Sequence, residues 1–171
     1  MQIIDCDRSF APQILAILNE AIVSSTALYD YRPRTPEMMS AWFDAKERGG
    51  FPVIGAVAKD ALLGFASYGI FRAWPAFKYT VEHSLYVERE SRGRGIGTKL
   101  LEEIVARARA QGLHNLVGGI DAENAASVSL HKKHGFEYCG RIRHAGFKFG
   151  RWLDLDFYQL LLDTPADPSD G

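Results

Sequence analysis

Hydrophobic and polar positions alternate along this chain with two different periods, which together predict an interleaved series of strands and helices. Apolar residues recur every three or four positions over 10–22 and over 96–108, as expected for amphipathic helices. Two further helices are predicted, one that begins after Thr35, whose hydroxyl can cap free N–H groups, and a short one over 124–134. Strands are predicted where short apolar or alternating runs lie between turns, at 2–5, 53–59, 62–70, 79–87, 116–121, 136–142 and 152–162.

The order of these elements predicts the fold class. Two consecutive strands are separated by only Asp60-Ala61, which indicates a tight antiparallel hairpin in the middle of the chain. Strands and helices otherwise alternate, so we expect an α/β domain with a mixed sheet flanked by helices. This single domain spans 1–163, and the last residues, 164–171, contain no large apolar side chain and are expected to form a loose tail.

Composition and charge limit the classes of protein that the chain can represent. Its 171 residues are 47% hydrophobic, which is enough for one core. A net charge of −1 gives no overall attraction to nucleic acid or to an anionic membrane. No apolar run is long enough to cross a membrane and residues 1–7 do not resemble a secretion signal, so a cytoplasmic protein is expected. Cys6 and Cys139 form neither a CxxC pair nor a disulfide framework and are expected to be packing residues.

The segment between the predicted strand 79–87 and the helix 96–108 carries the clearest chemical signal. Its sequence is Arg89-Glu90-Ser91-Arg92-Gly93-Arg94-Gly95-Ile96-Gly97-Thr98. Glycines let the backbone approach a ligand, and free N–H groups at a helix N-terminus bind anions, so this glycine turn is predicted to hold a phosphate group. The alternative is a charged surface turn that only caps the helix.

Other phosphate-binding and anion-binding motifs fit this segment less well. A Walker A loop is excluded because no Gly-Lys-Ser/Thr follows at the required spacing. The glycine spacing also departs from the dinucleotide-binding fingerprint, and the segment follows a hairpin instead of opening a parallel sheet. Three arginines lie in the turn, but no basic stripe extends them toward nucleic acid. A small cofactor that carries a pyrophosphate is therefore the favoured ligand.

Several segments resemble the Gcn5-related N-acetyltransferase (GNAT) superfamily. They are Arg92-x-x-Gly95-x-Gly97 after a strand ending in Leu85-Tyr86-Val87, and Asn124-Ala125-Ala126-Ser127 followed by Leu130-His131-x-x-His134-Gly135-Phe136. More narrowly, residues 80–87 and 146–154 resemble the phosphinothricin and methionine sulfoximine acetyltransferases. The resemblance covers residues 2–162.

This resemblance implies the GNAT fold, with a mostly antiparallel sheet splayed at its centre, and acetyl-CoA as co-substrate. The pantetheine arm would pair with the backbone of 85–87 like an added strand, and the pyrophosphate would bind the glycine turn. Asn124 would contact the cofactor, although capping of the following helix is an equally good role for it. The cofactor-binding residues implied are Leu85, Tyr86, Val87, Arg92, Gly93, Arg94, Gly95, Ile96, Gly97, Thr98, Asn124 and Ser127.

Amide formation needs a base for the amine and an acid for the departing thiolate. On the resemblance, Glu82 is the preferred base and acts through water, because an ordinary carboxylate accepts a proton poorly from an amine. It could instead attract the cationic amine, or be a solvated residue. His131 stands where many family members carry Tyr and is the candidate acid, with a structural role as its alternative. His131 and His134 lack partners that would complete a metal site, so no metal is expected.

The amine pocket is expected around the aromatic loop 71–79 and near 27–29, where relatives carry part of it. Arg72 can hold a carboxylate and Trp74 can wall the side chain, unless Trp74 packs under the loop and Arg72 is solvated. The substrate-binding residues implied are Arg72, Ala73, Trp74, Glu82, His83 and Ser84.

The leading hypothesis is transfer of acetyl from acetyl-CoA to the α-amine of a small amino acid or analogue, such as phosphinothricin, methionine sulfoximine or methionine sulfone. One alternative acceptor is a protein N-terminus or another metabolite amine. A different alternative is a non-catalytic acyl-CoA-binding module with the same fold. The resemblance also implies a homodimer, and no nucleic acid or membrane partner is expected.

Overall fold

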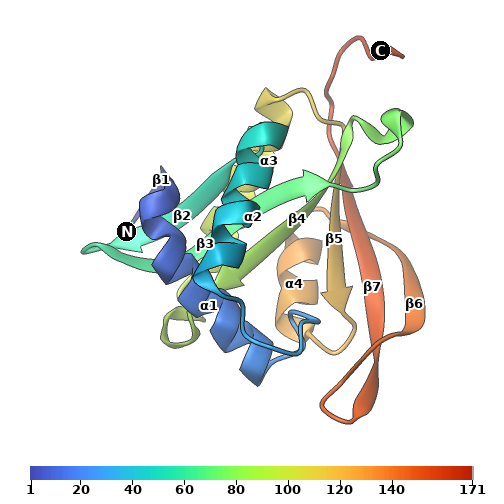
Figure 1. Cartoon of the computed structure of the whole chain (residues 1–171). Coiled ribbons are helices and arrows are strands. Elements are labelled where there is room, and N and C mark those ends of the chain that lie inside the picture. The colour runs from blue at the N-terminus through green and yellow to red at the C-terminus, as the bar shows by residue number, and fades with distance from the viewer. Residues whose placement is uncertain (171) are drawn as a thin grey trace.

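A computed structural model describes residues 1–170, and its centre is an open seven-stranded sheet (Figure 1). The strand order is β1-β2-β3-β4-β5-β7-β6. The strands are β1 (Gln2–Asp5), β2 (Val53–Ala58), β3 (Ala61–Ile70), β4 (Thr80–Val87), β5 (Asn115–Asp121), β6 (Glu137–Lys148) and β7 (Arg151–Leu161). All neighbours are antiparallel except β4 and β5, which are parallel, so the predicted mixed and mostly antiparallel sheet is confirmed.

Helices cover both faces of this sheet. They are α1 (Ala11–Ser24), α2 (Pro36–Gly49), α3 (Ile96–Ala110) and α4 (Ala125–Lys133). As predicted, the Thr35 side chain caps α2 by accepting a hydrogen bond from the backbone N–H of Met38. Asn124 caps α4 in the same way by accepting from the N–H of Ser127. Local polar side chains therefore fix where two of the helices begin.

Two hydrophobic clusters hold the helices against the sheet. The α3 side chains Leu100, Leu101 and Ile104 are buried in one cluster. The α1 and α2 side chains lie in the other, with Ile14 and Phe43 among them. Adjacent β2 residues belong to opposite clusters, because side chains alternate across a strand. This two-sided burial explains why the central strands are almost continuously apolar.

The sheet splays between β4 and β5. The two strands pair only where Thr80–Glu82 lies beside Asn115–Val117. Beyond this contact β4 continues along β3 as far as Val87, whereas β5 continues along β7 (Figure 1). The main chain of 83–87 therefore has no strand on its β5 side within residues 1–170. The predicted central splay is confirmed, and it leaves main-chain donors and acceptors open to a ligand.

Three local predictions were wrong. The hairpin turn is Lys59-Asp60, both with positive φ, so it lies one residue earlier than expected. β6 continues to Lys148 instead of ending at 142, because pairing with β7 extends a strand whose exposed side chains show no hydrophobic period. Cys139 is exposed on this edge strand and is not a packing residue, whereas Cys6 is buried.

The C-terminal segment is held at two points. The Thr164 hydroxyl donates to the carbonyl of Leu113, and the N–H of Ser169 donates to the Tyr79 hydroxyl. Residues 162–170 form no helix or strand. Gly171, the end of the predicted loose tail, lies outside the described residues.

Candidate active site

A cavity of about 640 Å³, here called the cofactor cavity, opens along the free edge of β4 and under the start of α3. Ile17 and Ala21 of α1 form its opposite wall. Arg94 does not line it. The other predicted cofactor residues do, namely Leu85, Tyr86, Val87, Arg92, Gly93, Gly95, Ile96, Gly97, Thr98, Asn124 and Ser127.

The glycine turn has the backbone geometry of an anion cradle. Gly95 has a φ of +76°, which favours glycine, and a Cβ at Gly95 would have no atom within 4 Å, so the space above it is open. No side chain caps α3, in contrast to α2 and α4. The first N–H groups of α3 therefore face the cavity without an intrahelical partner, as phosphate binding requires. The turn is also fastened to α1, because Arg92 Nη2 lies 2.9 Å from Glu20 Oε2.

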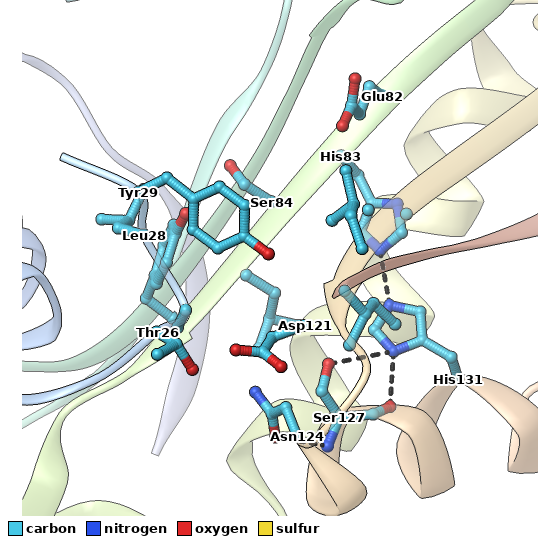
Figure 2. A pocket seen from close by; sticks show the side chains of 17 residues that line it. Thr26, Leu28, Tyr29, Glu82, His83, Ser84, Asp121, Asn124, Ser127 and His131 are labelled. Carbon is cyan, nitrogen blue, oxygen red and sulfur yellow. Dashed lines mark hydrogen bonds between the residues drawn. The ribbon is translucent and has the colours of Figure 1, made fainter. Parts of the chain in front are cut away.

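A second cavity of about 290 Å³, here called the reaction cavity, adjoins the first (Figure 2). Both are lined by Thr26, Ala27, Leu85, Tyr86, Asn124 and Ser127. The reaction cavity also contains the predicted Glu82, His83, Ser84 and His131. Side chains from β4, β5, α4 and the segment after α1 thus meet in one small space next to the cofactor cavity.

Glu82 provides the carboxylate of the reaction cavity. Burial raises the pKa of Glu82 above the ordinary range, and the positive charge of Arg72 lowers it by a smaller amount. The backbone of β5 leaves room for this side chain, since a Cβ on Gly119 would lie 3.0 Å from Glu82 Oε1. A partly buried carboxylate with a raised pKa is a better proton acceptor than an exposed one.

His83 and His131 form a buried pair in the same cavity (Figure 2). Their Nε2 atoms lie 2.8 Å apart. His83 Nδ1 lies 2.8 Å from the carbonyl oxygen of Val117, and His131 Nδ1 lies 2.7 Å from that of Ser127. Every ring nitrogen of the pair therefore has a hydrogen-bonding neighbour within the protein.

Two further polar groups line the cavity: Tyr29, which lies in the segment 27–29 where part of the pocket was expected, and Asp121, which was not predicted. Asp121 Oδ1 accepts a hydrogen bond from the N–H of Glu123, whereas Asp121 Oδ2 and the Tyr29 hydroxyl are buried and have no partner within residues 1–170. Figure 2 shows the Tyr29 hydroxyl pointing into the cavity. Burial and the Asp121 charge raise the pKa of Tyr29, so its hydroxyl stays neutral and can donate. Unpaired buried polar atoms are costly and mark a place for a polar ligand.

Lys148 fixes the segment that carries Tyr29. Its buried ammonium group donates to the carbonyl oxygens of Ile22, Ser25 and Leu28 at 2.7, 2.8 and 2.6 Å. These carbonyls lie at and just beyond the C-terminal end of α1, where a cation is favourable. This role of Lys148 could not be predicted from the sequence, because backbone acceptors leave no trace in it.

Comparison with known proteins identifies the family. Residues 16–136 match the family model described as acetyltransferase (GNAT) family. The chain belongs to the GNAT family. This GNAT chain is 50% identical over 155 residues to an L-methionine sulfoximine/L-methionine sulfone acetyltransferase from Pseudomonas paraeruginosa, covering 89% of both chains.

Two solved structures of N-acetyltransferases are similar to this GNAT chain in fold and in sequence. A GNAT superfamily phosphinothricin acetyltransferase from Sinorhizobium meliloti in complex with acetyl-CoA has a TM-score of 0.94 and 33% identity, covering 99% of this chain and 94% of that one. A ribosomal-protein-alanine N-acetyltransferase from Brucella melitensis has a TM-score of 0.93 and 41% identity, covering 95% and 100%. The protein is an acetyl-CoA-dependent N-acetyltransferase, with acetyl-CoA as its co-substrate.

The loop predicted to bind substrate lies outside the lining of the reaction cavity of this GNAT enzyme. Trp74 is 74% exposed, and Ala73 is exposed as well. Arg72 packs over the Phe71 ring and donates to the Phe71 carbonyl oxygen at 2.7 Å. Trp74 therefore does not pack under the loop, which was one alternative. It does not line the reaction cavity of the single chain either.

Within residues 1–170, no group of three or more His, Cys, Asp and Glu side chains is arranged to hold a metal ion. The same residues include no helix that is both long and apolar enough to cross a membrane.

Proposed function

We propose that this enzyme acetylates the α-amine of a small amino acid or analogue of the methionine sulfoximine, methionine sulfone and phosphinothricin class. The observation that carries the proposal is the reaction cavity, where Glu82 and His131 face a space of about 290 Å³ that shares its lining with the cofactor cavity. A space of this size accommodates a small amine. The names of the relatives supply the amino acid class.

The cofactor cavity is suited to hold acetyl-CoA, which would supply the thioester carbonyl. Main-chain groups of 85–87 would bind the pantetheine amides, and the glycine turn would bind the pyrophosphate. Asn124 and Ser127 line both cavities and would keep the two substrates next to each other. The backbone N–H groups of Tyr86 and Val87 would polarise the thioester oxygen.

Glu82 is the proposed base. The incoming ammonium must lose a proton before it can attack, and a raised carboxyl pKa reduces the mismatch between donor and acceptor. Transfer through one water allows Glu82 to act without contacting the nitrogen. His131 is the proposed acid, which protonates the leaving sulfur from the α4 side of the cavity.

The loop 71–79 is proposed to close over the amino acid from the rim of the cavity. Arg72 is near enough to Glu82 to lower the pKa of its carboxyl, which supports a place beside the substrate. There its guanidinium would bind the substrate carboxylate, with Ala73 and Trp74 beside the side chain and His83 and Ser84 below it.

A protein N-terminus is the second acceptor to be considered, because the Brucella melitensis structure carries the name of a ribosomal-protein-alanine N-acetyltransferase. The two acceptors differ in the group attached to the α-carbon. A free amino acid ends in a carboxylate that Arg72 would bind, whereas an N-terminal peptide continues as a chain. If the acceptor is a free amino acid, removal of its carboxylate should therefore raise the KM, whereas a peptide acceptor does not need that group.

The proposal also includes a homodimer formed through the outer edge of the sheet. β6 is the last strand there, and six large apolar side chains on the β6–β7 hairpin are exposed, namely Tyr138, Ile142, Phe147, Phe149, Trp152 and Leu161. Light scattering after size exclusion is expected to give twice the mass of one chain. A monomer would contradict this part.

A cytoplasmic location is also proposed, and it is supported by the two free cysteines, Cys6 and Cys139.

The deciding experiment monitors thiol release from acetyl-CoA with methionine sulfoximine, methionine sulfone, phosphinothricin, the corresponding α-amides without a carboxylate, and an alanine-starting peptide. Turnover of the free amino acids, with a higher KM for the amides, is the expected result. Turnover of the peptide alone would replace the proposal with the second acceptor. Binding of acetyl-CoA without turnover of any of these amines would show that the acceptor belongs to another class of amine.

A further inference from the structure

The paired imidazoles of the reaction cavity are placed so that they require three protons between them. The carbonyl oxygens of Val117 and Ser127 can only accept, and they lie 2.8 and 2.7 Å from the Nδ1 atoms of His83 and His131. The Ser127 hydroxyl lies farther from His131 Nδ1, at 3.4 Å, so both Nδ1 atoms are assigned as donors to the carbonyls. A neutral imidazole has a single N–H, which these bonds already use. Two neutral rings would then direct two lone pairs at each other across the 2.8 Å that separate the Nε2 atoms. A third proton between the Nε2 atoms removes this conflict.

We propose that His83 and His131 share one proton at neutral pH, and that this singly charged pair is the acid that protonates the departing CoA thiolate. The inference rests on the proposed function and deepens it. His131 is the donor, and His83 is a positioning residue, because its Nδ1 bond to Val117 turns its own Nε2 lone pair toward the shared proton. Without His83, a buried His131 would have no partner that keeps it charged.

Burial of the two rings opposes positive charge on the pair, and it opposes a second charge most strongly. Burial and the neighbouring ring lower the pKa of His83 to about 3, and burial lowers the pKa of His131, so a doubly charged pair is excluded at neutral pH. The singly charged pair gains a charge-assisted hydrogen bond that opposes this penalty. The titratable groups around the pair are Glu82 on β4, Asp121 on β5, Tyr29 after α1 and His134 just beyond α4, and the charge of His134 lowers the pKa of His131.

The backbone of β5 is shaped around this pair. A Cβ on Gly118 would lie 2.9 Å from His83 Cε1 and 3.4 Å from His131 Nε2, so only glycine allows the strand to pass this close to the rings. The Phe136 ring covers both imidazoles, with centroids 5.3 Å from His83 and 5.0 Å from His131. The proton between them is thus shielded from bulk water, and the Ser127 hydroxyl, 3.4 Å from His131 Nδ1, connects the pair to both cavities.

The protons of the reaction balance when this pair gives one proton to sulfur and regains one from the amine. The amine nitrogen forms a bond to the thioester carbon, the C–S bond breaks, and its electron pair stays on sulfur. His131 takes the shared proton at Nε2 and releases its Nδ1 proton to the Ser127 hydroxyl, 3.4 Å away, whose own proton moves to sulfur; this gives the free thiol and leaves the pair neutral. The ammonium loses two protons through Glu82 and water; one restores the pair and the other leaves to solvent.

The first test needs no substrate. Nitrogen NMR of the ¹⁵N-histidine-labelled wild-type enzyme at pH 7 is expected to show both Nδ1 atoms protonated and both Nε2 signals between the protonated and unprotonated values. A single step to two neutral rings should follow as the pH rises. Two fully unprotonated Nε2 signals at pH 7 would overturn the shared proton. This result is independent of whether any amine is acetylated, so failure of the proposed function remains distinguishable.

The second test compares His83→Leu with His114→Gln. His114 is a matched control outside both cavities, because its Nδ1 also lies beside a backbone carbonyl oxygen, that of Thr164. His83→Leu is expected to lower kcat at pH 8 by about 10² and to move the alkaline fall of kcat by about one pH unit to lower pH. Binding of acetyl-CoA should not change, and His114→Gln should keep the wild-type profile. An unaltered pH profile in folded His83→Leu would refute the positioning role. If that variant does not fold, the wild-type spectrum decides.

Discussion

Lys148→Met tests whether one buried ammonium group holds the wall of the reaction cavity. The side chain is 4% exposed and donates to the carbonyl oxygens of Ile22, Ser25 and Leu28. Methionine retains the apolar stem but has no donor. The three carbonyls then lose their partner in a place that water reaches poorly, and the end of α1 loses its cation.

The magnitude depends on the number of bonds lost and on the burial of the charge. A hydrogen bond to a charged group contributes about 1.5–3 kcal/mol, but removing the ammonium also removes the cost of burying it, so the three bonds do not add fully. We expect the free energy of unfolding to fall by about 3–5 kcal/mol, which lowers Tm by roughly 6–20 °C. The KM for the amine should rise about tenfold, because Leu28 and Tyr29 line the reaction cavity.

Lys46→Met is the matched control. Lys46 is partly buried, and burial lowers its pKa to about 8, but its ammonium donates to a single carbonyl oxygen, that of Tyr68, at 2.7 Å. Its replacement should lower the free energy of unfolding by about 1–2 kcal/mol and leave the KM for the amine unchanged. Thermal unfolding measured by circular dichroism, together with steady-state kinetics, reports both effects. Equal loss of stability in the two variants, with an unchanged amine KM in Lys148→Met, would refute the reasoning.

Three further predictions concern the site itself. Glu82→Gln should lower kcat about 10²-fold without weakening acetyl-CoA binding. Burial raises the Glu82 pKa and the base must be deprotonated, so the fall of kcat at acidic pH should disappear in this variant. Equal rates for the variant and the wild type at every pH would reject Glu82 as base. Gly95→Trp should block acetyl-CoA binding in calorimetry, whereas Gly50→Trp, at a similarly open positive-φ glycine outside the cavity, should not; undiminished binding by Gly95→Trp would reject the cradle. Asp121→Asn should raise the KM for the amine about tenfold by removing a buried negative charge near the ammonium, and an unchanged KM would show that Asp121 does not attract the substrate.

The parts of the site that could be predicted from the sequence are those with a local cause. The glycine turn is recognisable because a strand, closely spaced glycines and an amphipathic helix come directly after one another. Alternation along β4 likewise predicts that Glu82 and Tyr86 share one face while His83 lies on the other, and Tyr86 packs in the cluster opposite to that of Leu85.

The parts that escaped prediction depend on contacts distant in sequence. Lys148 bonds to carbonyls 120–126 positions earlier, and only the folded chain brings them together. Gly118 and Gly119 had a weak signal, since glycine inside a strand often marks a close approach. The approaching groups, a histidine pair on one face and Glu82 on the other, become evident only when β4 lies beside β5. The loop 71–79 has no period, so neither burial nor exposure of Trp74 could be derived from it.

The short contact between β4 and β5 has a consequence for how the enzyme responds to metabolism. In the proposed function the free edge of β4 binds its ligand through main-chain groups that contact pantetheine. Pantetheine is common to acetyl-CoA and to the product CoA, and the acetyl group adds only three heavy atoms. We therefore expect CoA to compete with acetyl-CoA at nearly equal affinity. The rate in a cell would then depend on the ratio of acetylated to free CoA, and acetylation would slow when acetyl units are scarce even if the total CoA pool is unchanged.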